Sequence, residues 1–497
     1  MHFPNWLLQR SRQNPEAIAL NFVSPTQEVK HWTYSQLQAE VELWIAYLQG
    51  LGVQAGDRVG LLLTNHPHYL LIVHALVQSE AIAVFLNTRL TAAELNWQIE
   101  DSQAQYLICD EFTQDLAKNL QDQIQDLIVE NCSSSILLSR IKNQNENINL
   151  ENIQGIFYTS GTTGKPKAVP LTYHNHFHSA ITSALHLRIN HQDNWLLCMP
   201  MFHVGGLAIA WRSVIYGTAI TLLPKFDEQE VLTAIANQGV TLISLVPTML
   251  TRLLRHPLAQ NLCNSKVRAV LLGGAPADPD LIEQCLELNL LILPTYGMTE
   301  TASQITTMPS QKLASKRGSV GLPLFGNRLR IVELDNPEQE VEIDEIGQIL
   351  VQSPSLMTGY LHQPKHEPNL HQEYWFPTGD LGYRDRDGYL YVVSRRSDLI
   401  ISGGENIYPS EIEAILLQHP AIAEVCVVGV SDSEWGESVA AVMVASSELS
   451  LAEVREFCLQ KSLAKYKLPK SIYIWESLPK TASGKLLRQN IRDFISQ

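Results

Sequence analysis

The sequence has little of what marks a membrane or secreted protein. The longest apolar stretch, residues 69–86, is interrupted by polar side chains, so no run reaches the ~18 apolar residues that a membrane-spanning helix needs. The seven cysteines form no C-x-x-C pair and their number is odd, which predicts reduced thiols. Residues 1–12 lack the charged-then-apolar order of a signal peptide. We therefore expect a cytoplasmic protein with no membrane span.

Positive charge is also scarce. Lys and Arg number 36 against 51 Asp and Glu, which gives a net charge of −15. A protein that binds duplex nucleic acid usually needs a basic face, so we expect no nucleic-acid partner. The 497 residues are 45% apolar and 18% charged, an ordinary globular composition that is long enough for two or three domains.

The middle of the chain alternates between short apolar runs and helical periodicity. Predicted strands cover residues 155–159, 194–199, 219–223, 241–246, 267–272 and 290–293. Predicted helices cover residues 173–187, 207–216, 228–237, 248–254 and 279–288, the first with Thr172 as its cap. Strand–helix units with short Gly- and Pro-rich joins indicate a largely parallel sheet covered by helices.

From about Gly318 the pattern changes to short, turn-rich strands, and the polar run Ser394–Asp398 follows them. The last hundred residues contain helices and strands enough to fold alone. We therefore predict an α/β protein with two domains. Residues 1–396 would form helix-covered, mostly parallel sheets plus a β-rich subdomain, and residues 397–497 a small, mobile α+β domain.

One loop carries most of the chemical information. It consists of Thr159, Ser160, Gly161, Thr162, Thr163, Gly164, Lys165, Pro166 and Lys167, directly after a predicted strand. Glycines let backbone N–H groups approach an anion, hydroxyls add donors and lysines add charge, so the loop fits a phosphate group. It is not a Walker A loop, because Pro166 stands where that motif has Ser or Thr. On local chemistry alone, a flexible Ser/Gly/Thr loop stays open as the alternative.

This loop resembles the phosphate loop of the adenylate-forming superfamily, which contains acyl-CoA synthetases, adenylation domains and beetle luciferases. Further motifs follow in that family's order along essentially the whole chain. They are Met201-Phe202-His203, Gly273-Gly274-Ala275-Pro276, Tyr296-Gly297-Met298-Thr299-Glu300, Thr378-Gly379-Asp380, Arg395 before Ser402-Gly403-Gly404-Glu405-Asn406, and Pro479-Lys480-Thr481-Ala482-Ser483-Gly484-Lys485. The resemblance implies a two-step ligase that uses ATP, Mg²⁺ and a thiol such as CoA.

The resemblance also assigns roles in the first step, in which a carboxylate joins the α-phosphate of ATP. The Thr159–Lys167 loop would hold the β- and γ-phosphates. Glu300 would be the Mg²⁺ ligand and Thr299 would donate to the α-phosphate. The adenine slot would be lined by Gly274, Ala275 and Tyr296, and Gly297 is a further cofactor-binding residue. Asp380 with Arg395 would hold the ribose, and Lys485 would bridge the reacting oxygens.

In the second step a thiolate attacks the acyl-adenylate. By resemblance, Ser397 and Asp398 form the hinge about which the small domain rotates, although Ser397 stands where Asp or Lys is common. Gly403 and Gly404 would leave room for a narrow pantetheine tunnel, and Phe202 and His203 would lie where acyl group and thiol meet. Lys465 and Lys467 are candidates for the CoA phosphates.

Within the superfamily, three runs most resemble the o-succinylbenzoate–CoA ligases of menaquinone and phylloquinone biosynthesis. They cover residues 211–217, 297–305 and 395–409. That substrate, 2-succinylbenzoate, carries a second carboxylate, for which Arg212 is the candidate partner and Ser303 a candidate hydroxyl donor. Arg212 stands among apolar neighbours, so its charge needs a partner; a structural ion pair with an acidic residue is the alternative.

Three rival functions remain open at this point. The chain could activate a different aryl or short-chain acid, or it could be a free-standing adenylation enzyme that serves a carrier protein. No carrier module follows Lys485, which favours the CoA ligase. The third rival is a nucleotide-binding protein without ligase activity, which the joint presence of Glu300, Asp380 and Lys485 disfavours. The sequence leaves a homo-oligomer open.

Overall fold

The protein folds into two compact units. The computed structural model describes residues 1–124, 126–132, 145–159, 166–275, 277–363, 374–402, 405–432, 435–461, 463, 465–480 and 486–496. The first unit contains Met1–Arg328 and Gln352–Tyr374, and the second contains Leu329–Val351 and Trp375–Gln497. The domain boundary predicted at 396/397 lies inside the second unit and stays a prediction.

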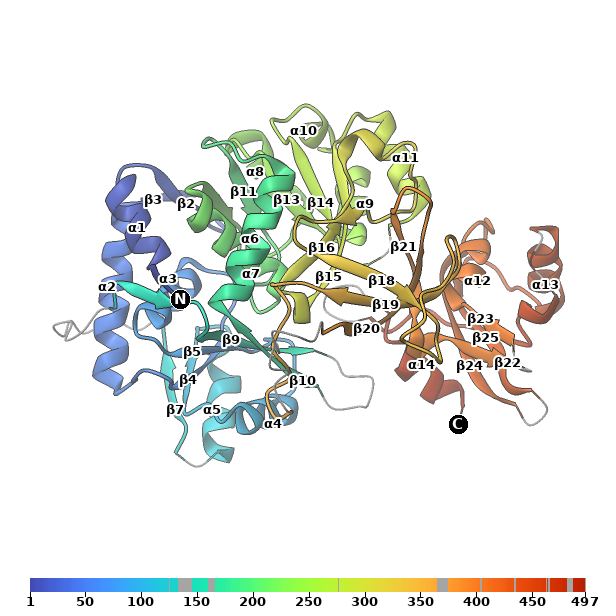
Figure 1. The fold of residues 1–497 in the computed structure, drawn as a ribbon, viewed down its shortest axis with the longest axis horizontal. Coiled ribbons are helices and arrows are strands. Elements are labelled where there is room, and N and C mark those ends of the chain that lie inside the picture. The colour runs from blue at the N-terminus through green and yellow to red at the C-terminus, as the bar shows by residue number, and fades with distance from the viewer. Residues whose placement is uncertain are drawn as a thin grey trace. The chain divides into compact units, whose positions relative to one another are not determined.

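Two large sheets form the framework of the first unit (Figure 1). One has, in spatial order, β10 (Lys167–Thr172), β9 (Ile153–Thr159), β5 (Ile82–Phe85), β4 (Arg58–Leu62), β6 (Tyr106–Cys109) and β7 (Ile128–Asn131). The other has β17 (Leu322–Pro323), β16 (Ser303–Thr307), β15 (Ile292–Met298), β14 (Ala269–Leu272), β13 (Leu242–Leu245), β11 (Asn194–Leu197), β12 (Ala219–Leu222), β2 (Ile18–Val23) and β3 (Val29–Thr33). A small separate pair joins β1 (His2–Pro4) to β8 (Asn147–Asn149).

The central strands of both large sheets run parallel, as the strand–helix alternation predicts. Among the described strands, antiparallel pairs occur toward the edges, where β9 meets β10, β15 meets β16, and β2 meets β3. Strand β10 is not among the strands predicted from the sequence, and it contains Pro170, a residue that sheets admit mainly at their edges. Pro170 is tolerated there because β10 lies at the edge of its sheet.

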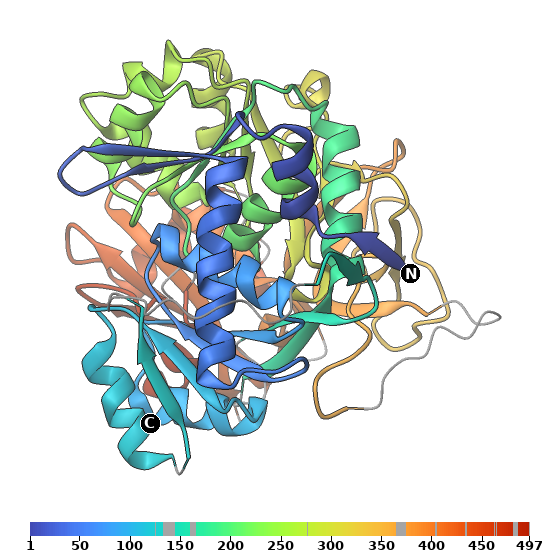
Figure 2. The same ribbon diagram turned by 90° about the vertical axis from the view of Figure 1, so that its left-hand side faces the viewer.

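Helices cover these sheets. They are α1 (Trp6–Gln13), α2 (Tyr34–Leu51), α3 (Pro67–Gln78), α4 (Ala92–Ser102), α5 (Gln114–Gln123), α6 (Tyr173–Leu187), α7 (Val204–Tyr216), α8 (Glu228–Asn237), α9 (Pro247–Arg255), α10 (Gln260–Cys263) and α11 (Pro279–Glu287). Figure 2 shows α2 as the long blue helix at the front. The bounds predicted for α6 and α8 agree with the structure, and the Thr172 hydroxyl accepts a hydrogen bond from the Asn175 N–H to cap α6.

The long apolar stretch at residues 69–86 forms most of α3 and then β5. Helix α3 is buried along nearly its whole length, so its apolar sequence serves the interior of the unit. In the described part of the chain, no helix is both long enough and apolar enough to cross a bilayer. All seven cysteines are free thiols, and all but the half-buried Cys263 are buried.

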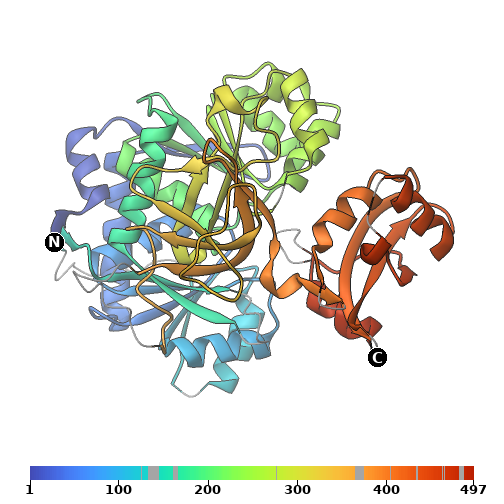
Figure 3. The ribbon, with the colours of Figure 1, turned by 45° about the vertical axis from the view of Figure 1, so that its right-hand side comes forward.

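The second unit contains two further sheets (Figure 3). One has β18 (Arg328–Val332), β19 (Gly347–Gln352), β20 (Phe376–Arg384) and β21 (Leu390–Arg395) in order. The other has β23 (Glu405–Ile407), β22 (Ile400–Ser402), β25 (Gly436–Ala445) and β24 (Ile422–Asp432), with β26 (Ser471–Ile474) also on β25. The helices of this unit are α12 (Pro409–Leu416), α13 (Leu451–Gln460) and α14 (Arg488–Ile495).

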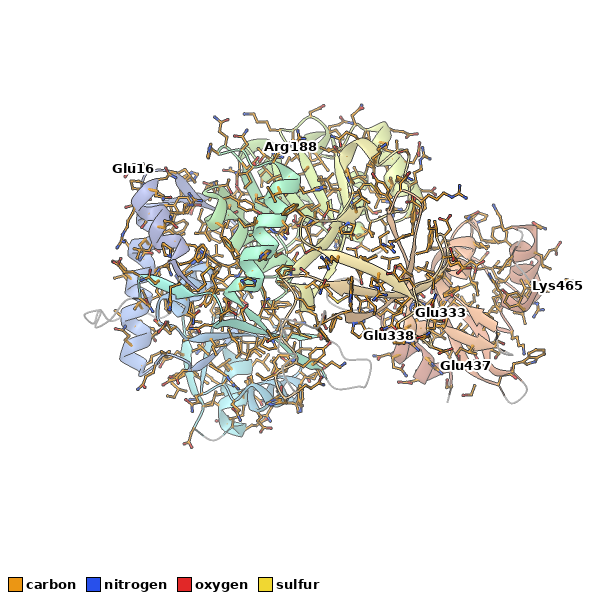
Figure 4. The ribbon with its side chains drawn as sticks, viewed as in Figure 1. Glu16, Arg188, Glu333, Glu338, Glu437 and Lys465 are labelled. Atoms are coloured by element: carbon orange, nitrogen blue, oxygen red, sulfur yellow. The ribbon has the colours of Figure 1, made fainter. Side chains whose placement is uncertain are left out.

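Strand β24 shows how the second sheet is covered on both faces. Val425 and Val427 pack in one apolar cluster with residues of α12 and α13, whereas Cys426 and Val428 pack in another with Ile491 of α14. This alternation follows from the two-residue period of a strand. At the start of β25, Glu437 (labelled in Figure 4) accepts the Ile401 N–H at 2.9 Å and pairs with Arg492 at 2.7 Å.

Candidate active site

Three of the predicted motifs follow parallel strands of one sheet at their carboxyl ends. Strand β11 leads to the motif that ends at His203, β14 leads to Gly274, and β15 leads to Thr299 and Glu300 in a short 3-10 helix, η1 (Thr299–Thr301). Because the carboxyl ends of parallel strands meet at one edge of a sheet, these loops share that edge. This is the usual position of a ligand site in an open α/β fold.

Thr159 and Lys167 lie opposite each other where the hairpin of β9 and β10 closes. The Thr159 Oγ1 lies 3.5 Å from the Lys167 carbonyl oxygen, to which it donates. The rest of the predicted phosphate loop, Ser160, Gly161, Thr162, Thr163, Gly164 and Lys165, lies outside the described residues. The hairpin therefore fixes both ends of the loop, and its phosphate-binding role stays a prediction.

Glu300 is hydrogen-bonded to Met357 and Tyr360, two residues that were not predicted to belong to the site. The Tyr360 hydroxyl donates to Glu300 Oε1 at 3.0 Å, and the Met357 N–H donates to the Glu300 carbonyl oxygen at 2.8 Å. The Lys167 ammonium lies 4.9 Å from the centroid of the Tyr360 ring. The proposed metal ligand and a lysine of the phosphate hairpin thus share one aromatic neighbour. No periodic pattern marks Tyr360, because it lies in a turn.

Arg212 is buried in α7, with a residue exposure of 3%. Its Nη2 donates to Ser303 Oγ at 3.3 Å, and its guanidinium lies 5.6 Å from the centroid of the Trp195 ring. Among the residues that the structure describes, its buried Nε has no hydrogen-bond partner. Within the described part of the chain, no Asp or Glu forms an ion pair with Arg212. The structural ion pair that the sequence left open therefore has no support.

Burial lowers the pKa of Arg212, and only the phenol of Tyr216 acts in the opposite direction. The neighbouring His176 is also buried; burial, followed by the charge of Arg212, lowers its pKa to about 3, so it is neutral at pH 7. Its Nε2 has no hydrogen-bond partner among the described residues. A buried cation with spare donor capacity is costly unless an anion joins it, which is the arrangement expected of a carboxylate subsite.

Ser303 reaches Arg212 through an unusual turn. Ala302 and Ser303 both have positive φ, at 50° and 110°, where L-residues carry backbone strain. The turn also brings the Ser303 carbonyl against Gly297, where a Cβ atom would lie 1.7 Å from that oxygen. Glycine is thus required at 297 by close approach. The strained turn lies directly after the Glu300 motif, in the region where the acyl group is expected.

Phe202 and His203 lie together at the start of α7. Their ring centroids are 4.6 Å apart, and His203 is the residue preceding the helix. Burial, followed by the charge of Arg89, lowers the pKa of His203 to about 4, so the ring is neutral at pH 7. Its Nε2 is buried without a hydrogen-bond partner in the described residues. Asn65 holds this motif, accepting the Met201 N–H at 3.1 Å and donating to the Met199 carbonyl oxygen at 2.9 Å.

The predicted adenine residues occupy two neighbouring strand ends. Tyr296 and Gly297 are half-buried on β15, and Gly274 and Ala275 are exposed after β14. In the second unit, Asp380 of β20 lies opposite Arg395 of β21, and Arg395 Nε is 3.3 Å from Asp380 Oδ1. The structure thus brings the two predicted ribose residues together, and their role stays a prediction.

The predicted hinge residues Ser397 and Asp398 belong to a short 3-10 helix, η3 (Arg396–Asp398). Asp398 Oδ2 lies 3.4 Å from Arg488 Nε, and Arg488 also forms two hydrogen bonds to the Glu413 carboxylate. Burial would lower the pKa of Arg488, but the hydrogen bonds and charge of Glu413 outweigh it and raise that pKa. The hinge is therefore tied to the helix α14 that follows the predicted catalytic lysine.

Three predicted site residues of the second unit lie outside the described residues: Gly403, Gly404 and Lys485. Lys467 lies in a short 3-10 helix, η4 (Lys465–Lys467), and forms an ion pair with Glu411 at 2.7 Å. Lys465 is exposed beside α13 (Figure 4). The role of these lysines at CoA phosphates stays a prediction.

Two family comparisons cover most of the chain. Residues 7–361 match the AMP-binding enzyme family, and residues 411–485 match the AMP-binding enzyme C-terminal domain. The chain belongs to the AMP-binding enzyme family. The predicted fold class and the AMP-forming ligase chemistry are thereby confirmed.

Relatives of this AMP-binding enzyme match it over its full length. The 2-succinylbenzoate–CoA ligase of Bacillus cereus (strain Q1) is 42% identical over 494 residues, which cover 99% of each chain. The o-succinylbenzoate CoA synthetase of Bacillus subtilis, solved with the acyl-adenylate intermediate, is 39% identical, with a TM-score of 0.91 and 99% of each chain covered. The same protein solved with ATP and magnesium ion has a TM-score of 0.88 and 38% identity, covering 99% of this chain and 100% of that one.

The donor set around Glu300 fits magnesium. Among the described residues, no three His, Cys, Asp or Glu side chains gather as a metal site. Mg²⁺ prefers oxygen ligands and is often held by one or two carboxylates together with substrate phosphates. The Glu300 carboxylate, with Oε1 already bonded to Tyr360, can supply its other oxygen to a cation.

Proposed function

We propose that this enzyme joins 2-succinylbenzoate to CoA at the expense of ATP, in menaquinone or phylloquinone biosynthesis. The products are 2-succinylbenzoyl-CoA, AMP and pyrophosphate, and the reaction passes through an acyl-adenylate. Full-length similarity to ligases named for this acid supports the proposal. The cofactors are ATP, Mg²⁺ and CoA.

The observation that carries the choice of acid is the buried Arg212, which forms no ion pair with any Asp or Glu that the structure describes. 2-Succinylbenzoate has two carboxylates; the succinyl one is activated, and the ring one must enter a pocket without losing its hydrogen bonds. Arg212 offers a buried cation with spare donors, and Ser303 adds a hydroxyl at 3.3 Å. A fatty or simple aryl acid has no second anion for this cation, so its pocket would not need one.

The first half-reaction brings two anions together, so charge neutralisation and positioning dominate its catalysis. The hairpin loop that ends at Lys167 holds the β- and γ-phosphates, Thr299 donates to the α-phosphate, and Asp380 with Arg395 holds the ribose. When bound at Glu300, Mg²⁺ supplies positive charge to the phosphates. Lys485 bridges carboxylate and phosphate oxygens as negative charge moves toward pyrophosphate, a task suited to a compact cation.

In the second half-reaction the CoA thiolate attacks the acyl carbon of the adenylate, and AMP leaves. Rotation about Ser397 and Asp398 removes Lys485 and brings Gly403 and Gly404 to the acyl carbon, where they admit a narrow thiol chain. Phe202 and the neutral ring of His203 line this position and exclude water. We also propose a cytoplasmic location, because the seven thiols are free.

Pyrophosphate release tests the proposal. The purified enzyme is given ATP and Mg²⁺ with 2-succinylbenzoate, benzoate, 4-coumarate, acetate or octanoate, with and without CoA. We expect rapid turnover only with 2-succinylbenzoate and CoA. Turnover with another acid would leave the adenylating mechanism and remove the pathway assignment. Adenylate formation without thioester would favour a carrier protein as the acceptor.

A further inference from the structure

We infer that Tyr360 is a positioning residue that orients the Glu300 carboxylate before ATP and metal bind. This inference rests on the proposed role of Glu300 as the metal ligand. The relevant contacts all lie in the first unit and come from one turn, residues 357–361, which joins the Glu300 segment to β10.

The turn fixes Glu300 at both of its ends. The Met357 N–H donates to the Glu300 carbonyl oxygen at 2.8 Å, while the Tyr360 hydroxyl donates to Glu300 Oε1 at 3.0 Å. The turn is itself attached to the phosphate hairpin, because the Leu361 N–H donates to the Ala168 carbonyl oxygen at 3.1 Å. Residues 357–361 therefore hold both the backbone and the side chain of Glu300, and they are also hydrogen-bonded to the β9–β10 hairpin.

The phenol has a specific chemical effect on the carboxylate. A free Glu side chain has three rotatable bonds and two equivalent oxygens, so holding it for a metal costs conformational entropy. The Tyr360 hydroxyl bonds to Oε1, so Oε2 is the oxygen that would take the cation in the inferred arrangement. Hydrogen-bond donors behind a ligand carboxylate are the usual means by which proteins orient metal ligands.

The ring of Tyr360 has a second, separable task. The Lys167 ammonium lies 4.9 Å from its centroid, within the range of a cation–π contact. Tyr360→Phe removes the hydroxyl and keeps the ring, whereas Tyr360→Leu removes both. The phenol is thus predicted to govern metal affinity, and the ring to govern the placement of Lys167 at the nucleotide.

The test measures the metal's contribution to nucleotide binding, without turnover. Calorimetry gives the affinity for α,β-methylene-ATP, which cannot be cleaved at the reacting bond, with Mn²⁺ and in EDTA; the ratio of the two is the metal's contribution. We expect Tyr360→Phe to reduce this ratio roughly 10-fold, the lower end for loss of a ligand-orienting group, and to leave metal-free binding unchanged. Tyr360→Leu should weaken metal-free binding as well.

Tyr47→Phe is the matched control, because the Tyr47 hydroxyl of α2 donates to Glu130 Oε2 of β7 at 2.8 Å, a tyrosine–glutamate hydrogen bond of the same kind. The ratio of its nucleotide affinity with Mn²⁺ to that in EDTA should equal the wild-type ratio. An unchanged ratio in Tyr360→Phe, or equal losses in Tyr360→Phe and Tyr47→Phe, would overturn the inference. Wild-type turnover of an acid other than 2-succinylbenzoate would remove the proposed substrate and leave this result standing. Absence of any metal effect in the wild type would overturn Glu300 as ligand and the inference with it.

Discussion

Replacing Arg212 separates a substrate-binding cation from a structural one, because the two roles predict opposite effects on stability. Arg212→Met keeps the apolar stem and removes the charge. Breaking a buried ion pair by removing one partner usually costs about 3–5 kcal/mol, since the other charge is left unpaired. No described Asp or Glu pairs with Arg212, so its removal leaves no such charge. We therefore expect the melting temperature of Arg212→Met to stay equal or rise.

The same variant should lose affinity for the acid. A hydrogen bond to a charged group contributes about 1.5–3 kcal/mol, and an unpaired buried carboxylate would cost at least as much. The expected loss is thus roughly 10- to 150-fold in kcat/KM for 2-succinylbenzoate. The KM for ATP should change little, which serves as an internal control in the same coupled pyrophosphate assay.

A substrate analogue completes the comparison. 4-Oxo-4-phenylbutanoate lacks the ring carboxylate and keeps the succinyl carboxylate that is activated. The wild type should prefer 2-succinylbenzoate over this analogue by the same factor that Arg212→Met loses, and the variant should discriminate little between them. Ser303→Ala should show a smaller loss in the same direction. A destabilised Arg212→Met that retains its preference for the diacid would refute the reasoning and make Arg212 structural.

Three further predictions concern other parts of the chain. Lys485→Ala should abolish acid-dependent pyrophosphate release but spare thioester formation from supplied acyl-adenylate; loss of both would remove its assignment to the first step. Burial and the charge of Arg212 lower the pKa of His176 to about 3, whereas the same side chain in the unfolded protein has a pKa of about 6.5. The free energy of unfolding therefore falls as the pH drops below about 6.5, by up to about 1.4 kcal/mol per pH unit. His176→Gln should flatten this dependence of melting temperature on pH, and an unchanged slope would contradict it. Arg488→Met leaves the buried Glu413 unpaired and should lose about 3–5 kcal/mol in urea unfolding, whereas Arg492→Met, whose Glu437 partner is more exposed, should lose much less.

Several elements could be read from the sequence because local signals agreed with the fold. Helix α6 has its start and end as predicted, since Thr172 and Asn175 cap each other's backbone and the apolar period runs to Leu187. Strand β10 could not be predicted in the same way, because Pro170 is permitted only by its edge position. An edge position is a property of the whole sheet.

At the candidate site, too, some features could be predicted from the sequence and others could not. The motif residues could be located by resemblance, and the structure brings Arg212 to Ser303 and Asp380 to Arg395, as their predicted shared tasks require. Whether an acidic residue neutralises Arg212 depends on tertiary contacts, so the sequence had to leave both interpretations open. Tyr360 had no signal, because a turn has no period and its partner Glu300 lies sixty residues away.

A competition experiment between acids decides which acid the enzyme activates. The wild-type enzyme is given equal concentrations of 2-succinylbenzoate, benzoate, 4-coumarate, acetate and octanoate with ATP, Mg²⁺ and CoA, and the thioesters are identified by mass spectrometry. We expect 2-succinylbenzoyl-CoA to form almost alone, and we expect this preference to collapse in Arg212→Met. A different thioester as the main product of the wild type would contradict it.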